Sequence, residues 1–184
     1  MSFNIHTAKI FLLPCILFAA TAFVAMFAPQ SRDWLLPVLF LLLPFVDVQW
    51  SMPQIHLARQ SLISWVILSL AIFILLLQNT QLLDLFTVMV LVAALPEEWF
   101  FRAYLQKRLG NHVAAVLIVS LLFSLLHYIT HRSAEAWLVF IPSIFFGWIY
   151  KKTDDLILVV LLHALSNLLY YIYLESHFVA FFAR

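Results

Sequence analysis

The sequence predicts an all-α membrane protein, a polytopic bundle of about seven transmembrane helices forming a single domain over residues 1–184. Apolar residues make up 65% of the chain and charged residues 10%, whereas a soluble domain is about half apolar and about a quarter charged. A water-soluble fold of this size cannot hide so much apolar surface, so its solvent must be lipid. Gly occurs only twice and Phe 18 times, which favours helices over a β-barrel, whose strands alternate polar and apolar residues.

Apolar runs separated by polar breaks define the expected spans, at the roughly 20-residue length that crosses a bilayer. Five prolines lie inside these runs, and each frees a backbone carbonyl that a neighbouring helix must satisfy. The prolines are Pro14, Pro37, Pro44, Pro96 and Pro142. The expected spans are 10–28, 34–50, 62–78, 83–108, 113–129, 136–150 and 156–174.

The first apolar run allows two interpretations. It is long enough for a span, but Lys9 precedes it and Ala20-Thr21-Ala22 resembles a signal-peptide cleavage site. The sequence leaves open whether this segment is cleaved. The single cysteine, Cys15, excludes an intrachain disulfide, and the near-neutral net charge of +1 gives no indication of nucleic-acid binding.

The distribution of Lys and Arg predicts the orientation. With seven spans, six of these residues fall on the side of the N-terminus and three on the opposite side. Because cytoplasmic loops are enriched in Lys and Arg, we expect the N-terminus in the cytoplasm and the C-terminus outside. The six are Lys9, Arg59, Lys107, Arg108, Lys151 and Lys152, and the three are Arg32, Arg132 and Arg184.

Three predicted spans carry ionisable or amide side chains where lipid disfavours them. A charged group at the bilayer centre costs roughly 2.5–3.5 kcal/mol even on the mild insertion scale, so such residues indicate a functional site. At a rise of about 1.5 Å per residue, all of them lie at comparable depth, roughly 10–21 Å from the cytoplasmic ends of their spans. We therefore expect them to line one cavity that water enters from the cytoplasmic side. They are Glu97 or Glu98 in span 83–108, His127 in span 113–129, and His163 and Asn167 in span 156–174.

Spacing within the helices supports a shared site. Glu98 and Arg102 are four residues apart and can pair. His163 and Asn167 are also four apart, so both can point into one cavity. Phe123 lies one turn before His127 and can wall the same cavity. Because Glu97 and Glu98 are about 100° apart on the helix, one can face the cavity while the other pairs with Arg102; the sequence does not say which.

The three motifs together resemble one family of membrane proteases. Glu97-Glu98-x-x-x-Arg102, then Phe123-x-x-x-His127, then His163-x-x-x-Asn167 is similar to the motif set of the CAAX proteases and bacteriocin-processing enzymes, the Abi or type II CAAX prenyl endopeptidase family. The resemblance covers a catalytic core of about 83–173. The short chain resembles the small bacterial members, so it implies an inner (plasma) membrane protein.

The resemblance implies hydrolysis of a peptide bond within the membrane, in a peptide or membrane-anchored protein substrate such as one with a C-terminal signal. In that family the first Glu and the first His hold and activate a water, which carries over to Glu97 and His127. His163 and Asn167 would stabilise the oxyanion, and Glu98, Arg102 and Phe123 would support the site. We expect no metal; zinc held by His127, His163 and Glu97 is the alternative.

Two other classes of function stay open at this stage. The same buried polar cluster could serve a transporter or a proton relay, although the sequence shows no internal repeat of the kind typical of transporters. It could also belong to a non-catalytic immunity or scaffold protein. Residue types alone do not separate these from an enzyme, and the oligomeric state is not readable from the sequence.

The orientation can be tested with reporter fusions. A reporter active only in the cytoplasm should be inactive when fused after Arg184, because the Lys and Arg count places that end outside. The same reporter fused after Gly110, between spans 83–108 and 113–129, should be active. Cytoplasmic activity at Arg184 would contradict the predicted orientation.

Overall fold

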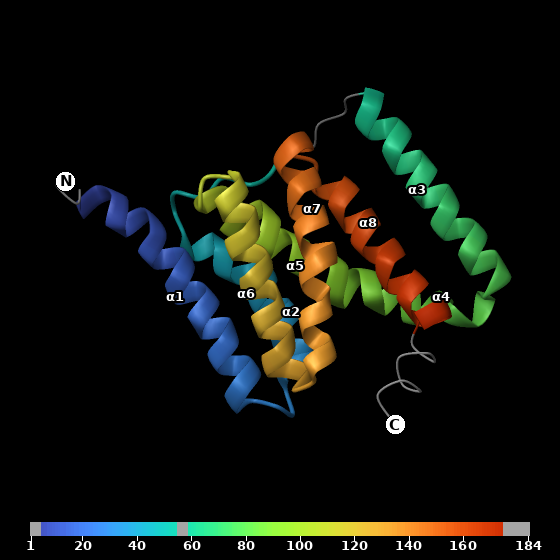
Figure 1. The fold of residues 1–184 in the computed structure, drawn as a ribbon, viewed down its shortest axis with the longest axis horizontal. Coiled ribbons are helices and arrows are strands. Elements are labelled where there is room, and N and C mark those ends of the chain that lie inside the picture. Colours follow the sequence, from blue (N-terminus) through green and yellow to red (C-terminus); the bar gives the residue numbers. More distant parts are fainter. Residues whose placement is uncertain (1–4, 55–58, 175–184) are drawn as a thin grey trace.

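The computed structural model describes residues 5–54 and 59–174. Within those ranges the chain forms seven helical segments and no strand, so the predicted all-α fold is confirmed. Figure 1 shows the segments side by side as a bundle, with α3 at the periphery alongside α8. The end at Arg184 lies outside the described residues, so the orientation stays a prediction.

The segments follow the expected apolar runs closely, and several change helix type along their length. The first three are α1 (Ile5–Phe27), α2 (Arg32–Leu42) with a 3₁₀ turn Leu43–Val46, and α3 (Arg59–Gln78). The fourth runs through a 3₁₀ turn Thr80–Leu82, α4 (Leu83–Val88), a π-helical stretch Met89–Ala94, α5 (Leu95–Glu98) and a second π-helical stretch Trp99–Gln106. The last three are α6 (Val113–His131), a 3₁₀ turn Ala134–Val139 with α7 (Phe140–Thr153), and α8 (Leu156–Leu169) with a π-helical turn Tyr170–Leu174.

Four helices in the described ranges are long and apolar enough to cross a membrane: Gln60–Gln78, Thr80–Gln106, Val113–His131 and Leu156–Tyr173. The protein is therefore an integral membrane protein. The predicted span 34–50 is shorter than expected, because its helix ends at Val46. Asp47, the next residue, is buried and forms an ion pair with Arg108, with 2.7 Å between Asp47 Oδ2 and Arg108 Nε.

The fourth segment departs from α-helical geometry around Pro96. A proline inside a helix has no N–H to donate and its ring clashes with the carbonyl four residues earlier, here that of Val92. The π-helical stretch Met89–Ala94 lies directly before Leu95 and Pro96, and Trp99–Gln106 follows Glu98. π-Helical turns widen the helix and are frequent at functional sites. The two adjacent glutamates therefore lie in a short α-helical interval between two wider stretches.

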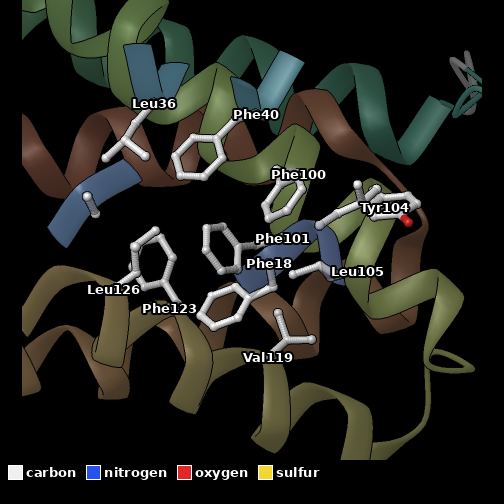
Figure 2. Packing of buried hydrophobic residues seen from close by; sticks show 12 residues of the cluster. Phe18, Leu36, Phe40, Phe100, Phe101, Tyr104, Leu105, Val119, Phe123 and Leu126 are labelled. Carbon is white, nitrogen blue, oxygen red and sulfur yellow. The ribbon is translucent and has the colours of Figure 1, made fainter. Parts of the chain in front are cut away.

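The stretch Trp99–Gln106 is the centre of the molecule, since nearly every side chain in it is buried. Phe100 and Phe101 have no exposed surface; Phe100 stacks on Phe40 of α2 with 5.1 Å between ring centroids, and Phe101 meets Phe123 of α6 edge-on at 5.0 Å. Figure 2 shows these rings together with Phe18 of α1. In a bilayer, close packing and hydrogen bonds hold helices together because water exclusion supplies little force. This aromatic cluster thus fixes α1, α2 and α6 around the segment that carries the glutamates.

Gly147 of α7 allows a close approach between α7, α6 and the central stretch. Its carbonyl accepts a hydrogen bond of 2.9 Å from Gln106 Nε2, whose amide also donates to Asn111 Oδ1 at 2.7 Å. A Cβ at position 147 would lie 2.9 Å from Gln106 Oε1 and 3.0 Å from Val116 Cγ1. A side chain here would therefore force buried neighbours apart.

Replacing Gly147 by Ala should destabilise the protein by about 1–3 kcal/mol, the usual cost of adding volume to a filled core. Thermal unfolding of the purified protein in detergent measures the effect. Ile141→Val is the matched control, because Ile141 lies on the same helix and is 71% exposed. An unfolding midpoint for Gly147→Ala equal to that of the control would contradict the close approach.

Candidate active site

Glu98 and Arg102 form a fully buried ion pair, as the spacing predicted. Arg102 Nε donates to Glu98 Oε2 at 3.0 Å, and neither side chain has exposed surface. Arg102 Nη2 also donates to Ser143 Oγ of α7 at 2.8 Å. Buried charges are tolerated when they are paired and hydrogen-bonded. The pair therefore joins α7 to the central helix and fixes the position of the Glu98 carboxylate.

His163 of α8 is held by the other oxygen of the same carboxylate. The distance from His163 Nδ1 to Glu98 Oε1 is 2.9 Å. A carboxylate only accepts, so Nδ1 carries the proton. Phe146 stacks on the imidazole with 5.4 Å between ring centroids. This arrangement leaves His163 Nε2 directed towards Glu97, with 3.8 Å between Nε2 and Glu97 Oε2.

Glu97 differs from its neighbour in having no partner that saturates it. Its side chain is 16% exposed and lines a cavity, whereas Glu98 lines neither of the two cavities described below. Glu97 Oε2 is buried and has no hydrogen-bond partner among the described residues. Of the two glutamates that the sequence could not tell apart, Glu98 is thus engaged with Arg102 and His163, and Glu97 is the one that faces a cavity.

His127 of α6 lies beside this group. Its Nδ1 donates to the carbonyl of Phe123 at 3.1 Å, and no hydrogen bond to Nε2 is found among the described residues. The Phe123 ring lies 4.3 Å from the His127 ring and 6.2 Å from that of His163, between centroids. Phe123 therefore walls the site between the two histidines, as expected.

Asn167 lies one turn after His163 on α8 and lines the same cavity. It is half-buried, and no hydrogen bond to its side-chain amide is found within the described ranges. The amide is therefore free to bind a group that enters the cavity.

Two cavities meet at these residues, where one was expected. The smaller, of about 220 Å³, is lined by Glu97 and His127 and extends to Arg32 and Asp33. The larger, of about 530 Å³, is lined by Phe123, His127, His163 and Asn167, with Ser166 of α8 and Tyr170 of the π-helical turn that follows it. His127 and His131 line both. Glu97 is therefore separated from the larger cavity, although its carboxylate lies close to His163.

Both cavities extend to the end of the bundle that holds Arg32, His131 and Glu135. Neither of these two cavities reaches the end that holds Lys107 and Arg108, from which access was expected. The Asp47–Arg108 ion pair and the hydrogen bonds of Gln106 described above lie towards that end. In the orientation predicted from the Lys and Arg count, the accessible end is the outer one.

The zinc alternative can be tested against the side-chain arrangement. A zinc site needs three ligands at about 2.0–2.2 Å from the metal. In the described part of the chain, no three His, Cys, Asp or Glu side chains are arranged to hold a metal ion. His163 Nε2 and Glu97 Oε2 lie 3.8 Å apart, but no third side chain of these types completes a ligand set with them among the described residues. The residues present do not fit zinc in this arrangement, and no step below is assigned to a metal.

Three residues at the site were not among the predicted ones. Ser143 accepts from Arg102, Phe146 stacks on His163, and His131 lines both cavities. His131 follows His127 by one helical turn, and this spacing was available in the sequence. Ser143 carries no such signal, because a serine in an apolar span is common and its partner is 41 residues away along the chain.

Comparison with known proteins relates the chain to a family of membrane proteases. The sequence model of the family described as type II CAAX prenyl endopeptidase Rce1-like matches residues 78–169, which is half of the 184-residue chain. The matched range contains all seven predicted site residues. No curated protein and no solved structure matches the sequence. The predicted resemblance is confirmed: the chain belongs to the Rce1-like type II CAAX prenyl endopeptidase family of membrane proteases.

Proposed function

We propose that the protein is an intramembrane endopeptidase in which Glu97 activates a water for attack on a peptide bond. The observation that carries this proposal is the different surroundings of two adjacent glutamates. Glu98 is saturated by Arg102 and His163, whereas Glu97 lines a cavity and has a buried oxygen without a hydrogen-bond partner among the described residues. A general base needs a free carboxylate within reach of the water it activates, and Glu97 supplies one.

The reaction follows from these positions. Glu97 accepts a proton from water, and the hydroxide adds to the carbonyl carbon of the substrate. The tetrahedral intermediate then expels the amine, which takes the proton back from Glu97. One water and one peptide give a carboxylic acid and an amine, so atoms and charge balance. The free Nε2 of His127 orients the water opposite Glu97.

Asn167 and His163 are suited to stabilise the charge on the carbonyl oxygen. The Asn167 amide is free and faces the larger cavity, where its N–H can donate to an oxyanion. His163 donates from Nε2 when both ring nitrogens carry protons. Removing one such donor from a hydrolase costs about 10²–10³ in kcat. The Glu98–Arg102 pair contributes indirectly, because it holds the imidazole of His163 in place.

The substrate we propose is a membrane-associated polypeptide cut close to its C-terminus. The larger cavity is mostly apolar, with Phe146, Val139 and Leu138 among its walls, and its volume of about 530 Å³ falls in the range of ligand pockets. The family description refers to CAAX prenyl endopeptidases. An internally quenched peptide with an apolar C-terminal CAAX-type segment, in farnesylated and unmodified forms, is therefore a suitable first probe.

Replacing Glu97 by Gln should abolish cleavage of this peptide and leave the unfolding temperature unchanged, because an amide cannot take the proton and Glu97 has no saturating partner to lose. Glu98→Gln should instead destabilise the protein by about 3–5 kcal/mol, since it leaves the Arg102 charge buried and uncompensated. Asp84→Asn, at an exposed acidic residue of α4, is the neutral control. Full activity of Glu97→Gln at normal protein level would refute Glu97 as the base, whereas a parent protein that cleaves neither form of the peptide would favour a scaffold or transporter.

Cleavage should not depend on a metal. Purified protein dialysed exhaustively against a chelator should keep its activity, because the predicted ligands Glu97, His127 and His163 are not arranged as a ligand set. Metal content measured by mass spectrometry in parallel should be far below one ion per chain. Stoichiometric zinc, with activity lost on its removal and restored on its return, would overturn the carboxylate mechanism in favour of a metal-bound one.

A further inference from the structure

The two cavities divide the site between the groups that act on water and those that act on the substrate. Glu97 lines only the smaller cavity, and His163 and Asn167 line only the larger one. His127 lines both, and its ring is held in the wall by the Phe123 carbonyl. The base and the oxyanion donors therefore line different cavities, although Glu97 Oε2 lies 3.8 Å from His163 Nε2.

We propose that the smaller cavity is a separate water compartment that supplies the attacking water while the peptide fills the larger cavity. This inference rests on the proposed peptidase function and adds to it a path for the second reactant. Each bond cleaved consumes one water. A peptide bound in the larger cavity blocks the approach of water from that side, so a second approach lets hydrolysis proceed with the substrate in place.

The size of the smaller cavity fits water better than peptide. The smaller cavity, of about 220 Å³, has room for several waters, since a cavity of roughly 10–15 Å³ already admits one. It lies below the range of about 300–1,000 Å³ typical of pockets that bind larger ligands. The larger cavity, of about 530 Å³, lies within that range.

The lining of the smaller cavity also provides hydrogen-bonding partners for water from its outer end to its inner end. Arg32 and Asp33 lie at the start of α2, with 3.6 Å between Arg32 Nε and Asp33 Oδ1, and His131 lies at the end of α6. Glu97 and His127 lie at the inner end of this cavity. Buried waters are stable where they have two to four polar partners. The unpartnered Oε2 of Glu97, which has no hydrogen bond within the described residues, gives the innermost water a strong acceptor.

Matched substitutions separate the two roles. Ala93 lines only the smaller cavity and Ala136 only the larger one. Ala93→Leu should lower kcat by about tenfold or more with KM within about twofold of the parent, because it displaces water and not substrate. Ala136→Leu should raise KM, because it narrows the peptide site. A raised KM with unchanged kcat for Ala93→Leu would overturn the assignment.

Cysteine labelling tests the same division without relying on turnover. In a Cys15→Ser background, which removes the single native cysteine, Ala93→Cys and Ala136→Cys are treated with 2-aminoethyl methanethiosulfonate. The reaction is run in Glu97→Gln protein with and without the saturating quenched peptide. The thiol introduced at position 93 should react at the same rate in both cases. The thiol introduced at position 136 should be protected about tenfold, since only the larger cavity binds peptide.

These experiments distinguish failure of the water-compartment inference from failure of the proposed peptidase function. If the parent protein cleaves neither form of the peptide, the peptidase proposal fails whatever the labelling shows. If it cleaves the peptide but the thiol at position 93 is protected as strongly as the one at position 136, the peptidase proposal stands and the separate water compartment is refuted. A thiol at position 93 that never reacts with the aqueous reagent would refute it too.

Discussion

The buried ion pair between Glu98 and Arg102 is the interaction on which the site depends. Two charges without exposed surface remain in the membrane interior because each satisfies the other. Arg102 also donates to Ser143 of α7, and Glu98 also accepts from His163 of α8. One pair thus connects three separate segments of the chain. The position of His163 is a consequence of this connection, and both His163 and Ser143 line the larger cavity.

The same pair explains how two adjacent glutamates can have different tasks. Neighbouring residues on a helix point about 100° apart. A helix that directs Glu98 into the protein interior therefore directs Glu97 towards the smaller cavity. Glu98 acts as a fixed charge that positions an imidazole, whereas Glu97 keeps a carboxylate free for a proton. The two glutamates are therefore not redundant, although both carry the same carboxyl group. Their roles follow from the direction of each side chain and from the residues that it contacts.

The sequence predicted the parts that depend on local spacing. The helices follow from apolar runs, and the pairing of Glu98 with Arg102 follows from their separation of four residues. The separation into two cavities could not be predicted, because it depends on where α2 and the α6–α7 connection lie relative to Glu97. Depth along a helix, which the sequence does give, says nothing about which side a cavity opens to. The partner of Arg102 on α7 was missed for a similar reason: a contact between distant segments leaves no periodic pattern.

The π-helical stretch Met89–Ala94 also separates two properties that are usually linked in a helix, the number of its residues and the direction of its side chains. A π turn holds one residue more than an α turn, so losing a single residue there would let the turn close as an α turn. The side chains on either side of that point would then keep their directions. The same loss in α-helical geometry would rotate everything beyond it by about 100°. The stretch before Glu97 and Glu98 can therefore absorb a change in residue number that elsewhere in the helix would redirect a catalytic carboxylate.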